Sequence, residues 1–382
     1  MELLRLSDCQ IEWVAREWAA LDEIAEGSFF VSWTWVGAWL ASLEDLSTLY
    51  LIRLMQADRT VALGILGRAP RSGLRRMSAR SIRLNESGTP SEDRITIEHN
   101  GLLIREGLHA AVWFALLDHL RRKRRLWQEF RVSGVSQAEQ IAALADVTAR
   151  LGLMRRIRDR SPYYWVDLDE VRQNENGYLG CLSSNTRYQL RRASKRYARS
   201  GDLVVTEAAE LDEAFGVFKA MKLLHQAYWE EKGSAGAFAN GFTRRFHREL
   251  IGRGLVSKQI QLLTVTAGDE PIGYLYNFVY GSRVMSYQSG FAYQGDAKRK
   301  PGLVCHSRAI EHNSRIGNSV YDFLMGDSQY KRSLSTRAGE MVWIDIRRPL
   351  LRFKFEDHLR CIKAKVKAAR ADGDPDLRSV EQ

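Results

Sequence analysis

The sequence predicts a mixed α/β protein made of two similar halves, and three observations support this prediction. The chain has 382 residues, which suits two domains of about 150 to 200 residues each. Residues 51–67 and 262–279 each show two β-rich runs around a short polar turn, which is the pattern of a hairpin. Each hairpin is followed by apolar residues at helical spacing and then by another strand-like run. We therefore expect two copies of one unit, each with a mixed sheet.

The first copy is expected to occupy residues 1–160. Its hairpin turns at Ala57-Asp58-Arg59, its helix spans about Leu108 to Arg124, and a strand follows in LWQEFRVSG. The apolar run FFVSWTWVGAWL, residues 29–40, is shorter than the roughly 20 residues that cross a bilayer. We interpret it as a buried helix with Ser32 as its N-cap, and a membrane-surface anchor is the alternative.

The second copy is expected at residues 161–350, and residues 351–382 are expected to form a C-terminal basic helix and a frayed tail. The strand-like run YYWVDLD begins the second copy after Ser161-Pro162. The other elements expected here are a basic helix from Asn185 to Arg199, helices at about Leu211 to Lys232 and in FTRRFHRELIGRG, a hairpin turn at Gly268-Asp269-Glu270, a helix from Gly302 to Arg315, and the strands VYDFLMGD and MVWIDIRR.

Composition narrows the class of protein. The net charge of +11 favours polyanionic partners such as nucleic acid, a membrane surface or a phosphate-bearing cofactor or substrate. The four cysteines lie far apart without a CxxC pair, which argues against a zinc ribbon or a disulfide framework and indicates a reducing compartment. We expect a cytoplasmic protein without a signal peptide or transmembrane segment. The absence of HExxH and GxxxxGK[ST] motifs leads us to expect no metal site and no nucleotide hydrolysis through a P-loop.

The segment KRKPG, residues 298–302, stands immediately before an expected helix of the second copy. A helix N-terminus offers unpaired backbone N–H groups and the positive end of the helix dipole. Lys298, Arg299 and Lys300 add positive charge. Pro301 suits a first helical turn, and Gly302 lets a ligand approach the backbone closely. The pattern predicts a pyrophosphate site, and a solvated basic loop is the alternative.

The order of motifs along the chain resembles that of the GNAT acyltransferase superfamily. The resembling segments lie between residue 29 and about residue 348, and they are FFVSWTWVGAWL, NTRYQLRRASKRY, LLHQAYWEEKGSAGAF, FHREL, GDEPIGYLYNF, SYQSGF, KPG and YDFLMGDSQYK. The two-copy arrangement is similar to the FemAB-like branch, above all to the CelD-like acetyltransferase domain found with bacterial exopolysaccharide genes. The resemblance implies a tandem GNAT fold that moves an acyl group onto an amine or hydroxyl.

The resemblance also implies where the acyl donor binds. In GNAT folds two central parallel strands part, and the pantetheine arm of acyl-CoA enters the gap. Carried over to this chain, the parting strands are Ser286 to Phe291 and Val320 to Met325. The first copy has Gly107 but neither the proline nor the basic triplet, so we expect it to be structural or substrate-shaping, with one active site per chain. The donor contacts implied by the resemblance are Tyr287, Ser289, Gly290, Lys298, Lys300, Pro301, Gly302 and Leu303.

The acceptor side is implied to be lined by catalytic candidates Asp322, Asp327, Tyr330 and Lys331. A carboxylate there would take the acceptor's proton, and a cation would orient an anionic acceptor. Other interpretations stay open: Asp322 as a buried acid paired with an arginine, Asp327 and Lys331 as a turn-capping salt bridge, and Tyr330 as packing. The acceptor contacts are assigned to Arg187, Arg191, His225, Trp229 and His247, although a lone helical histidine is often structural.

Three functional hypotheses follow. The first, implied by the resemblance, is an N- or O-acyltransferase that uses acyl-CoA, with acetyl-CoA foremost, and modifies a sugar, polysaccharide or cell-envelope precursor. The second takes the acyl group from aminoacyl-tRNA, as some FemAB relatives do, although the chain lacks the long charged heptad insertion of FemA-type relatives. The third is a non-catalytic GNAT-like pair that binds nucleic acid or scaffolds polysaccharide-synthesis machinery. The residues do not name the acceptor or the acyl chain.

Overall fold

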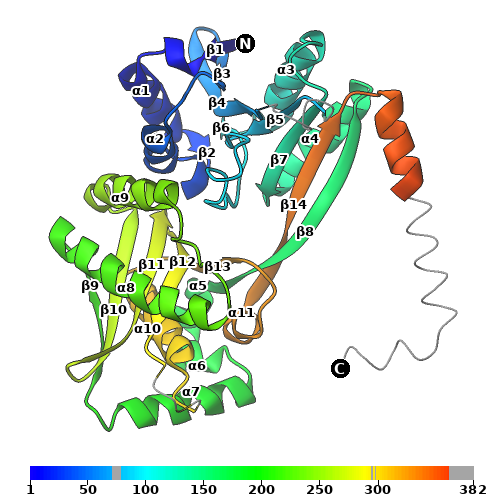
Figure 1. Cartoon of the computed structure of the whole chain (residues 1–382). Coiled ribbons are helices and arrows are strands. Elements are labelled where there is room, and N and C mark those ends of the chain that lie inside the picture. The colour runs from blue at the N-terminus through cyan, green and yellow to red at the C-terminus, as the bar shows by residue number, and fades with distance from the viewer. Residues whose placement is uncertain (71–78, 294–295, 297, 361–382) are drawn as a thin grey trace, which may run out of the picture.

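A computed structural model describes residues 1–70, 79–293, 296 and 298–360. Within these residues a mixed sheet of 14 strands runs through the whole molecule in the order β1-β3-β4-β5-β7-β14-β8-β13-β12-β11-β10-β9, with β2 and β6 beside this path (Figure 1). The order is symmetric about its centre, because the strands of the first half mirror those of the second. The predicted mixed α/β class with two similar units is confirmed.

Each half repeats one order of elements. The first half contains β1 (Glu2–Arg5), α1 (Ile11–Asp22), α2 (Trp33–Ser42), β3 (Leu49–Gln56), β4 (Arg59–Arg68), β5 (Ser81–Leu84), α3 (His109–Arg122), β7 (Glu129–Val135), α4 (Ala138–Arg150) and β8 (Met154–Asp167). The second half contains β9 (Leu203–Glu207), α8 (Leu211–Glu231), α9 (Gly241–Val256), β10 (Ile260–Ala267), β11 (Glu270–Tyr280), β12 (Arg283–Phe291), α10 (Pro301–Arg315), β13 (Val320–Met325), α11 (Gln329–Leu334) and β14 (Arg337–Arg347).

Short elements connect these units. They are the 3-10 helices η1 (Leu6–Asp8) and η2 (Phe29–Val31), the strands β2 (Ala25–Glu26) and β6 (Leu103–Arg105), and the helices α5 (Leu168–Gln173), α6 (Gly177–Gly180) and α7 (Ser184–Tyr197). Residues 351–360 are helical, as expected for the start of the C-terminal basic helix, and the expected frayed tail lies outside the described residues. Across the part of the chain that the structure describes, no helix is both long and apolar enough to cross a membrane.

The local predictions near the start of the chain are confirmed. Ala57 and Asp58 have φ angles of 48° and 60°, as a two-residue hairpin turn that matches the strand twist requires. The Oγ of Ser32 accepts a hydrogen bond from the backbone N–H of Trp35 at 3.4 Å, so Ser32 caps α2. Trp35 and Trp39 on this helix are each only 2% exposed, which favours the buried-helix interpretation over a surface anchor.

The last strand of each half lies in the other half. β8, which ends the first half, pairs with β13, whereas β14, which ends the second half, pairs with β7. The two exchanged strands also pair with each other along the whole of β14, from Arg337 opposite Trp165 to Arg347 opposite Met154 (Figure 1). The expected domain boundary between residues 160 and 161 therefore falls inside the continuous strand β8.

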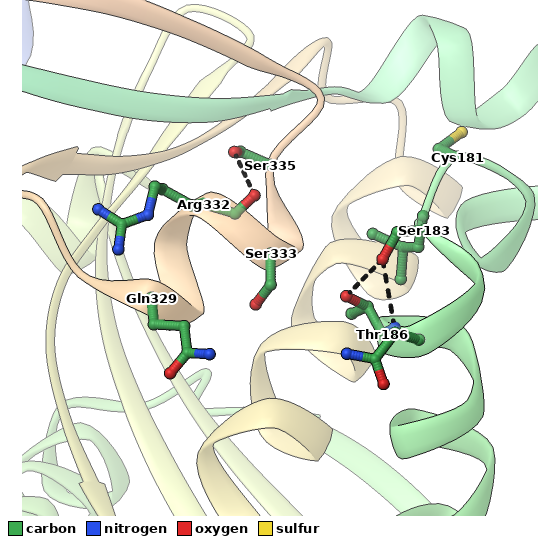
Figure 2. Close-up of a pocket in the computed structure, with 9 residues that line it drawn as sticks. Cys181, Ser183, Thr186, Gln329, Arg332, Ser333 and Ser335 are labelled. Carbon is green, nitrogen blue, oxygen red and sulfur yellow. Dashed lines mark hydrogen bonds between the residues drawn. The ribbon is translucent and has the colours of Figure 1, made fainter. Parts of the chain in front are cut away.

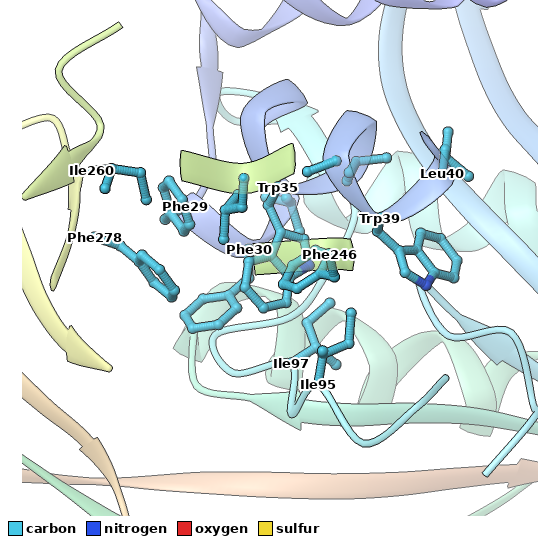
Figure 3. Packing of buried hydrophobic residues seen from close by; sticks show 14 of the residues in the cluster. Phe29, Phe30, Trp35, Trp39, Leu40, Ile95, Ile97, Phe246, Ile260 and Phe278 are labelled. Atoms are coloured by element: carbon cyan, nitrogen blue, oxygen red, sulfur yellow. The ribbon is translucent and has the colours of Figure 1, made fainter. Parts of the chain in front are cut away.

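The largest hydrophobic core joins the two halves. Helices α1 and α2 of the first half and α8 and α9 of the second contribute to it, and α2 lies against α9 (Figures 1 and 3). The rings of Trp35 and Phe246 lie 4.8 Å apart, and those of Phe29 and Phe278 stack at 4.3 Å. Such aromatic contacts bury much apolar surface, so this core fixes how the first half meets the second.

Candidate active site

The parallel strands β12 and β13 part at the centre of the second half. They pair only from Arg283 opposite Val320 to Met285 opposite Asp322, whereas β12 continues to Phe291. Each strand carries a bulge where they separate. Tyr287 is the extra residue in β12, because Gln288 pairs with Tyr276 and Ser286 with Asn277.

The bulge in β13 lies between Asp322 and Met325, which pair with Trp165 and Tyr163 of β8. A bulge bends its strand and disrupts the ladder. The two bulges thus accompany the divergence of the strands. The strands were expected to part along Ser286 to Phe291 and Val320 to Met325. They part along the whole of the first segment, but in the second only after Asp322.

The end of β13 is held in a strained shape by two carboxylates. Leu324 has a φ angle of 61°, a left-handed conformation that a leucine seldom adopts. Asp322 Oδ1 accepts a hydrogen bond from the backbone N–H of Leu324 at 2.7 Å. Glu98 Oε2, from the first half, accepts one from the N–H of Met325 at 2.6 Å. Backbone strain of this kind is typical of functional sites, and here it occurs where the strand end donates a hydrogen bond to the first half.

Asp322 is a fully buried carboxylate that contacts an arginine and a histidine. Its Oδ2 lies 2.8 Å from Arg283 Nη1 and 3.1 Å from His99 Nε2. Burial raises the pKa of Asp322, but the charge and hydrogen bonding of His99, followed by the charge of Arg283, outweigh burial and leave the pKa below its ordinary value. A carboxylate that holds its charge this firmly is a poor proton acceptor, and the arrangement matches the interpretation of Asp322 as a paired buried acid.

Glu98 is the carboxyl group whose proton affinity suits catalysis. The residue is 6% exposed, and burial raises its pKa to about 7. The hydrogen bond from Met325 and the charges of His99 and Lys331 act in the opposite direction without cancelling burial. A carboxyl group with such a pKa takes up and releases protons near neutral pH, which is the requirement for a general base.

His99 supports this site from the same loop. It has a φ angle of 46°, and its Nδ1 lies 2.6 Å from Ser136 Oγ. Its carbonyl oxygen accepts a hydrogen bond from Ser28 Oγ at 2.8 Å. Sequence reasoning missed both Glu98 and His99, because the segment before the first copy's helix was considered only for Gly107. The signal in the sequence was an adjacent acid and histidine inside an otherwise apolar run.

Two of the four predicted catalytic residues lie at this site. Lys331 Nζ donates hydrogen bonds to the carbonyl oxygens of Leu324 and Met325. Burial lowers the pKa of Lys331, and the nearby charges of Glu98 and Asp322 oppose the shift. Lys331 therefore joins Asp322 at the end of β13.

The other two predicted catalytic residues lie elsewhere. The ring of Tyr330 stacks on His306 of α10 at 5.5 Å, and burial raises the pKa of Tyr330 to about 12. Asp327 accepts a hydrogen bond from Tyr164 Oη at 3.0 Å and pairs with Arg332 on the surface. The placement of Asp327 matches the interpretation of a turn-capping salt bridge, although its partner is Arg332.

The corresponding gap in the first half is closed. Strands β5 and β7 pair in parallel only from Ser81 to Arg83 and from Glu129 to Arg131. Beyond this point Asn100 bridges the parted strands, because its Nδ2 donates to Leu84 O at 3.2 Å and its backbone N–H donates to Gly134 O at 2.9 Å. Asn100, which closes the gap between β5 and β7, thus directly follows Glu98 and His99, which contact the end of β13 beside the gap of the second half.

The predicted donor loop surrounds the start of α10. Lys300 has a φ angle of 45°, and its Nζ donates to Gln189 Oε1 of α7 at 2.7 Å. Pro301 is the first helical residue, and a Cβ placed on Gly302 would lie 3.0 Å from the ring of Phe291. Within the part of the chain that the structure describes, no side chain caps the start of α10.

The remaining predicted donor contacts are spread along β12 and α10. Ser289 O lies 3.2 Å from His225 Nδ1, and a Cβ on Gly290 would lie 2.3 Å from Met221 O. The backbone N–H of Lys298 donates to Asp296 Oδ1 at 2.9 Å, and Leu303 packs against the core beneath α10. Ser289 and Gly290 thus bring β12 against α8.

The predicted acceptor contacts do not form one group. His247 is fully buried among Phe218, Phe238 and other aromatic rings, and burial lowers its pKa to about 3, so it is a neutral core residue. His225 is buried where α8 meets β12, whereas Trp229 is partly exposed at the end of α8. Arg187 and Arg191 lie on α7, on the far side of the second-half sheet from α8 and α9 (Figure 1).

A cavity of about 370 Å³ lies between the start of α7 and α11. Figure 2 shows Ser183 and Thr186 of α7 on one side and Gln329, Ser333 and Arg332 on the other. Because α7 also contacts Lys300, this cavity and the predicted diphosphate site share one helix. Within the described ranges, no group of three or more His, Cys, Asp or Glu side chains is arranged to hold a metal ion.

Comparisons with known proteins agree with this geometry. Residues 184–332 match the family described as acetyltransferase (GNAT) domain. No curated protein matches the chain. The solved structure of FemX is 10% identical, with 90% of this chain and 97% of that chain covered and a TM-score of 0.59.

Two further solved structures are similar over most of their length. The C-terminal domain of a putative lysylphosphatidylglycerol synthetase from Agrobacterium fabrum is 9% identical, covering 94% of this chain and 97% of that chain at a TM-score of 0.54. L-PGS from Bacillus licheniformis is 10% identical, covering 88% and 92% at a TM-score of 0.54. Identities this low show a shared fold. The chain therefore shares the fold of FemX, built from two similar halves, and its residues 184–332 match the GNAT domain family.

Proposed function

We propose that the protein transfers an acyl group, with acetyl foremost, from acyl-CoA to an amine or hydroxyl of a sugar, polysaccharide or cell-envelope precursor. The observation that carries the proposal is Glu98, a buried carboxyl group with a pKa of about 7 that lies beside the parted ends of β12 and β13. The family match at residues 184–332 supports acyl transfer, and the sugar acceptor rests on the resemblance to CelD-like domains.

The proposed reaction is a direct transfer. The acceptor nitrogen or oxygen gives its proton to Glu98 and attacks the carbonyl carbon of the thioester. Backbone N–H groups of the bulged strand β12 stabilise the negative charge that develops on the carbonyl oxygen. The bond from carbon to sulfur then breaks, and the leaving thiolate takes up the proton that Glu98 releases, passed through water, so that Glu98 is again ionised. Asp322 and Lys331 keep the end of β13 in place, so that donor and acceptor meet in a fixed geometry.

In this proposal the donor lies with its diphosphate at the start of α10. Gly302 and the neighbouring amides would bind phosphate oxygens, and Lys298 and Lys300 would supply charge. The nucleotide end would extend along α7 toward the cavity between α7 and α11 (Figure 2). The pantetheine arm would run between β12 and β13 to reach Glu98.

Aminoacyl-tRNA is the second candidate donor. The exposed face of α7 favours it, because Tyr188 is 62% exposed, the Arg192 guanidinium lies 5.6 Å from its ring centre, and the helix contains no acid. Basic groups beside an exposed aromatic ring suit a nucleic-acid backbone and an unstacked base. The fold shared with FemX and with a putative lysylphosphatidylglycerol synthetase domain is compatible with either donor.

Thermal unfolding of the full chain separates these donors. Acetyl-CoA at about 100 times its Kd should stabilise the native state by about 2.7 kcal/mol and raise the Tm. Lys300→Ala should reduce this shift, whereas Lys219→Ala, an exposed change on α8, should leave it intact. Stabilisation by aminoacyl-tRNA without any effect of acyl-CoA would replace the first donor with the second. If neither donor stabilises the protein, the transferase proposal fails.

A further inference from the structure

A second cavity, of about 250 Å³, lies in the first half. It opens on the face of the sheet opposite α3 and α4, because Val132 and Ile344 pack under those helices while their neighbours in β7 and β14 point the other way. Six of the side chains around the cavity bear on its chemistry, and they are Glu86, Thr96, Arg131, Ser133, Arg158 and Trp343.

One wall of the cavity is fixed by an ion pair. Arg83 Nη1 lies 2.9 Å from Asp93 Oδ2, and Asp93 also accepts hydrogen bonds from Ser87 and from the N–H of Gly88. Glu86 lies beside this pair, and its Oε2 accepts a hydrogen bond from Ser133 Oγ at 2.7 Å. The wall therefore presents a carboxyl group and a hydroxyl group in a set orientation.

The two other arginines come from β7 and β8, the strands on either side of β14. Arg131 contacts Glu129 through its Nε at 2.6 Å, and Arg158 lies 3.4 Å from Asp345 Oδ1 through its Nε. Among the described residues no hydrogen bond is found from the terminal nitrogens of either guanidinium. These N–H groups can donate to a ligand, whereas Glu86 can accept from one.

The mixture of charges favours a neutral ligand rich in hydroxyl groups. A phosphate would meet Arg131 and Arg158 but also the acidic side chains Glu86 and Asp93, and the juxtaposition of like charges is costly. The hydroxyl groups of a sugar both donate and accept hydrogen bonds, so they suit both kinds of side chain. Trp343 also lines the cavity, and an indole ring can pack against the C–H groups of a sugar.

The cavity adjoins the candidate active site through one short segment. Thr96 and Ile97 line the cavity, and Glu98 is the next residue. This segment packs tightly against β7. A Cβ placed on Gly134, the residue after Ser133, would lie 2.7 Å from Ile97 O. The segment that lines the cavity therefore leads directly into the proposed base.

We propose that this cavity binds a sugar ring of the acceptor and so directs the acceptor's amino or hydroxyl group toward Glu98. The inference rests on the proposed function, and it gives the first half a role in recognising the substrate. The first copy would thus contribute both the base and a binding site, while its own donor gap stays closed by Asn100.

The test measures binding of methyl β-D-glucoside and methyl β-D-glucosaminide to the full chain by saturation-transfer NMR, with inorganic phosphate as a separate probe. Arg158→Met removes a cavity guanidinium, and Thr96→Trp fills the cavity from an exposed loop position. Arg160→Met is the matched control, because Arg160 is on the same strand and pairs with Glu340 at the surface. Both cavity variants should weaken sugar binding by at least about tenfold, and the control should not.

Sugar binding that is equal in all four proteins would overturn the inference, and so would phosphate binding without sugar binding. Arg158→Met removes a charge and Thr96→Trp fills space, so the test stays decisive if one of the two variants fails to fold. The subsite and the proposed function fail separately. If Arg158→Met still transfers acyl groups and its KM for a sugar acceptor is unchanged, the sugar subsite is refuted and the proposed function stands. If the chain binds the sugar but no acyl donor stabilises it, the transferase proposal is refuted and the sugar subsite stands.

Discussion

Glu98 accepts a hydrogen bond at 2.6 Å from the backbone N–H of Met325, a residue 227 positions away in the chain. This bond joins a loop of the first half to the strand end beside which the second half's central strands part. It places an acid with a pKa of about 7 at that point. The candidate active site is therefore composed of both halves.

Replacing Glu98 tests its proposed role directly. Glu98→Gln keeps an oxygen that accepts from Met325 but removes the group that takes the acceptor's proton, so kcat should fall about 10²- to 10⁴-fold. The Tm shift caused by acetyl-CoA should persist, because the donor site is intact. Glu106→Gln, an exposed change in the same region, is the control and should retain activity. Full activity of Glu98→Gln would show that another group is the base.

The same group predicts how activity depends on pH. Glu98 acts as a base only when it is ionised, so kcat/KM should rise with pH through an apparent pKa of about 7. A rate profile that stays flat between pH 5.5 and pH 8.5, on the order of 1.5 units either side of that pKa, would contradict this assignment.

Stability should change with pH in the opposite sense. The folded pKa of Glu98 is about 7, above the ordinary 4.5, so the folded state binds the proton more tightly than the unfolded state does. The free energy of unfolding should therefore decrease as pH rises from about 4.5 to about 7, by at most about 3 kcal/mol. Glu98→Gln should remove this loss and be more stable than the natural chain above pH 7. Denaturant unfolding at pH 4.5 and pH 8 measures the difference, and an equal loss in both proteins would count against it.

Asp322→Asn should destabilise the protein. The change leaves Arg283 and His99 without their buried anion, and breaking such a pair costs about 3 to 5 kcal/mol. Because the folded pKa of Asp322 is lowered, its contribution is present above the ordinary pKa of 3.8 and is lost as pH falls below it. Asp327→Asn is the control at an exposed ion pair and should leave the Tm unchanged. Similar Tm values for both variants would refute the structural role of Asp322.

Lys300→Gly tests separately what Lys300 contributes to stability through its backbone and to donor binding through its side chain. Glycine adopts the φ angle of 45° without the penalty of about 1 kcal/mol that a side chain incurs, so the Tm should not fall. The affinity for acetyl-CoA should fall, because the ammonium group beside the proposed diphosphate site is lost. Calorimetric titration measures the affinity, and unchanged binding would move the diphosphate away from α10.

The local elements could be predicted from the sequence, because their signals lie within a few residues. The turn at Ala57-Asp58 and the cap at Ser32 follow from short-range chemistry. The exchange of β8 and β14 could not be predicted, because pairing Trp165 with Arg337 joins distant segments whose own patterns fit many partners. The role of Glu98 was missed for the same reason, since its neighbour Met325 is remote in sequence.

The exchanged strands have an evolutionary consequence. A duplicated unit usually stays modular, so that one copy can be deleted or recombined into another gene. Here removal of either copy would strip β7 or β13 of its antiparallel neighbour and leave an open row of peptide groups prone to aggregation. Neither half is therefore expected to be stable when it is expressed without the other.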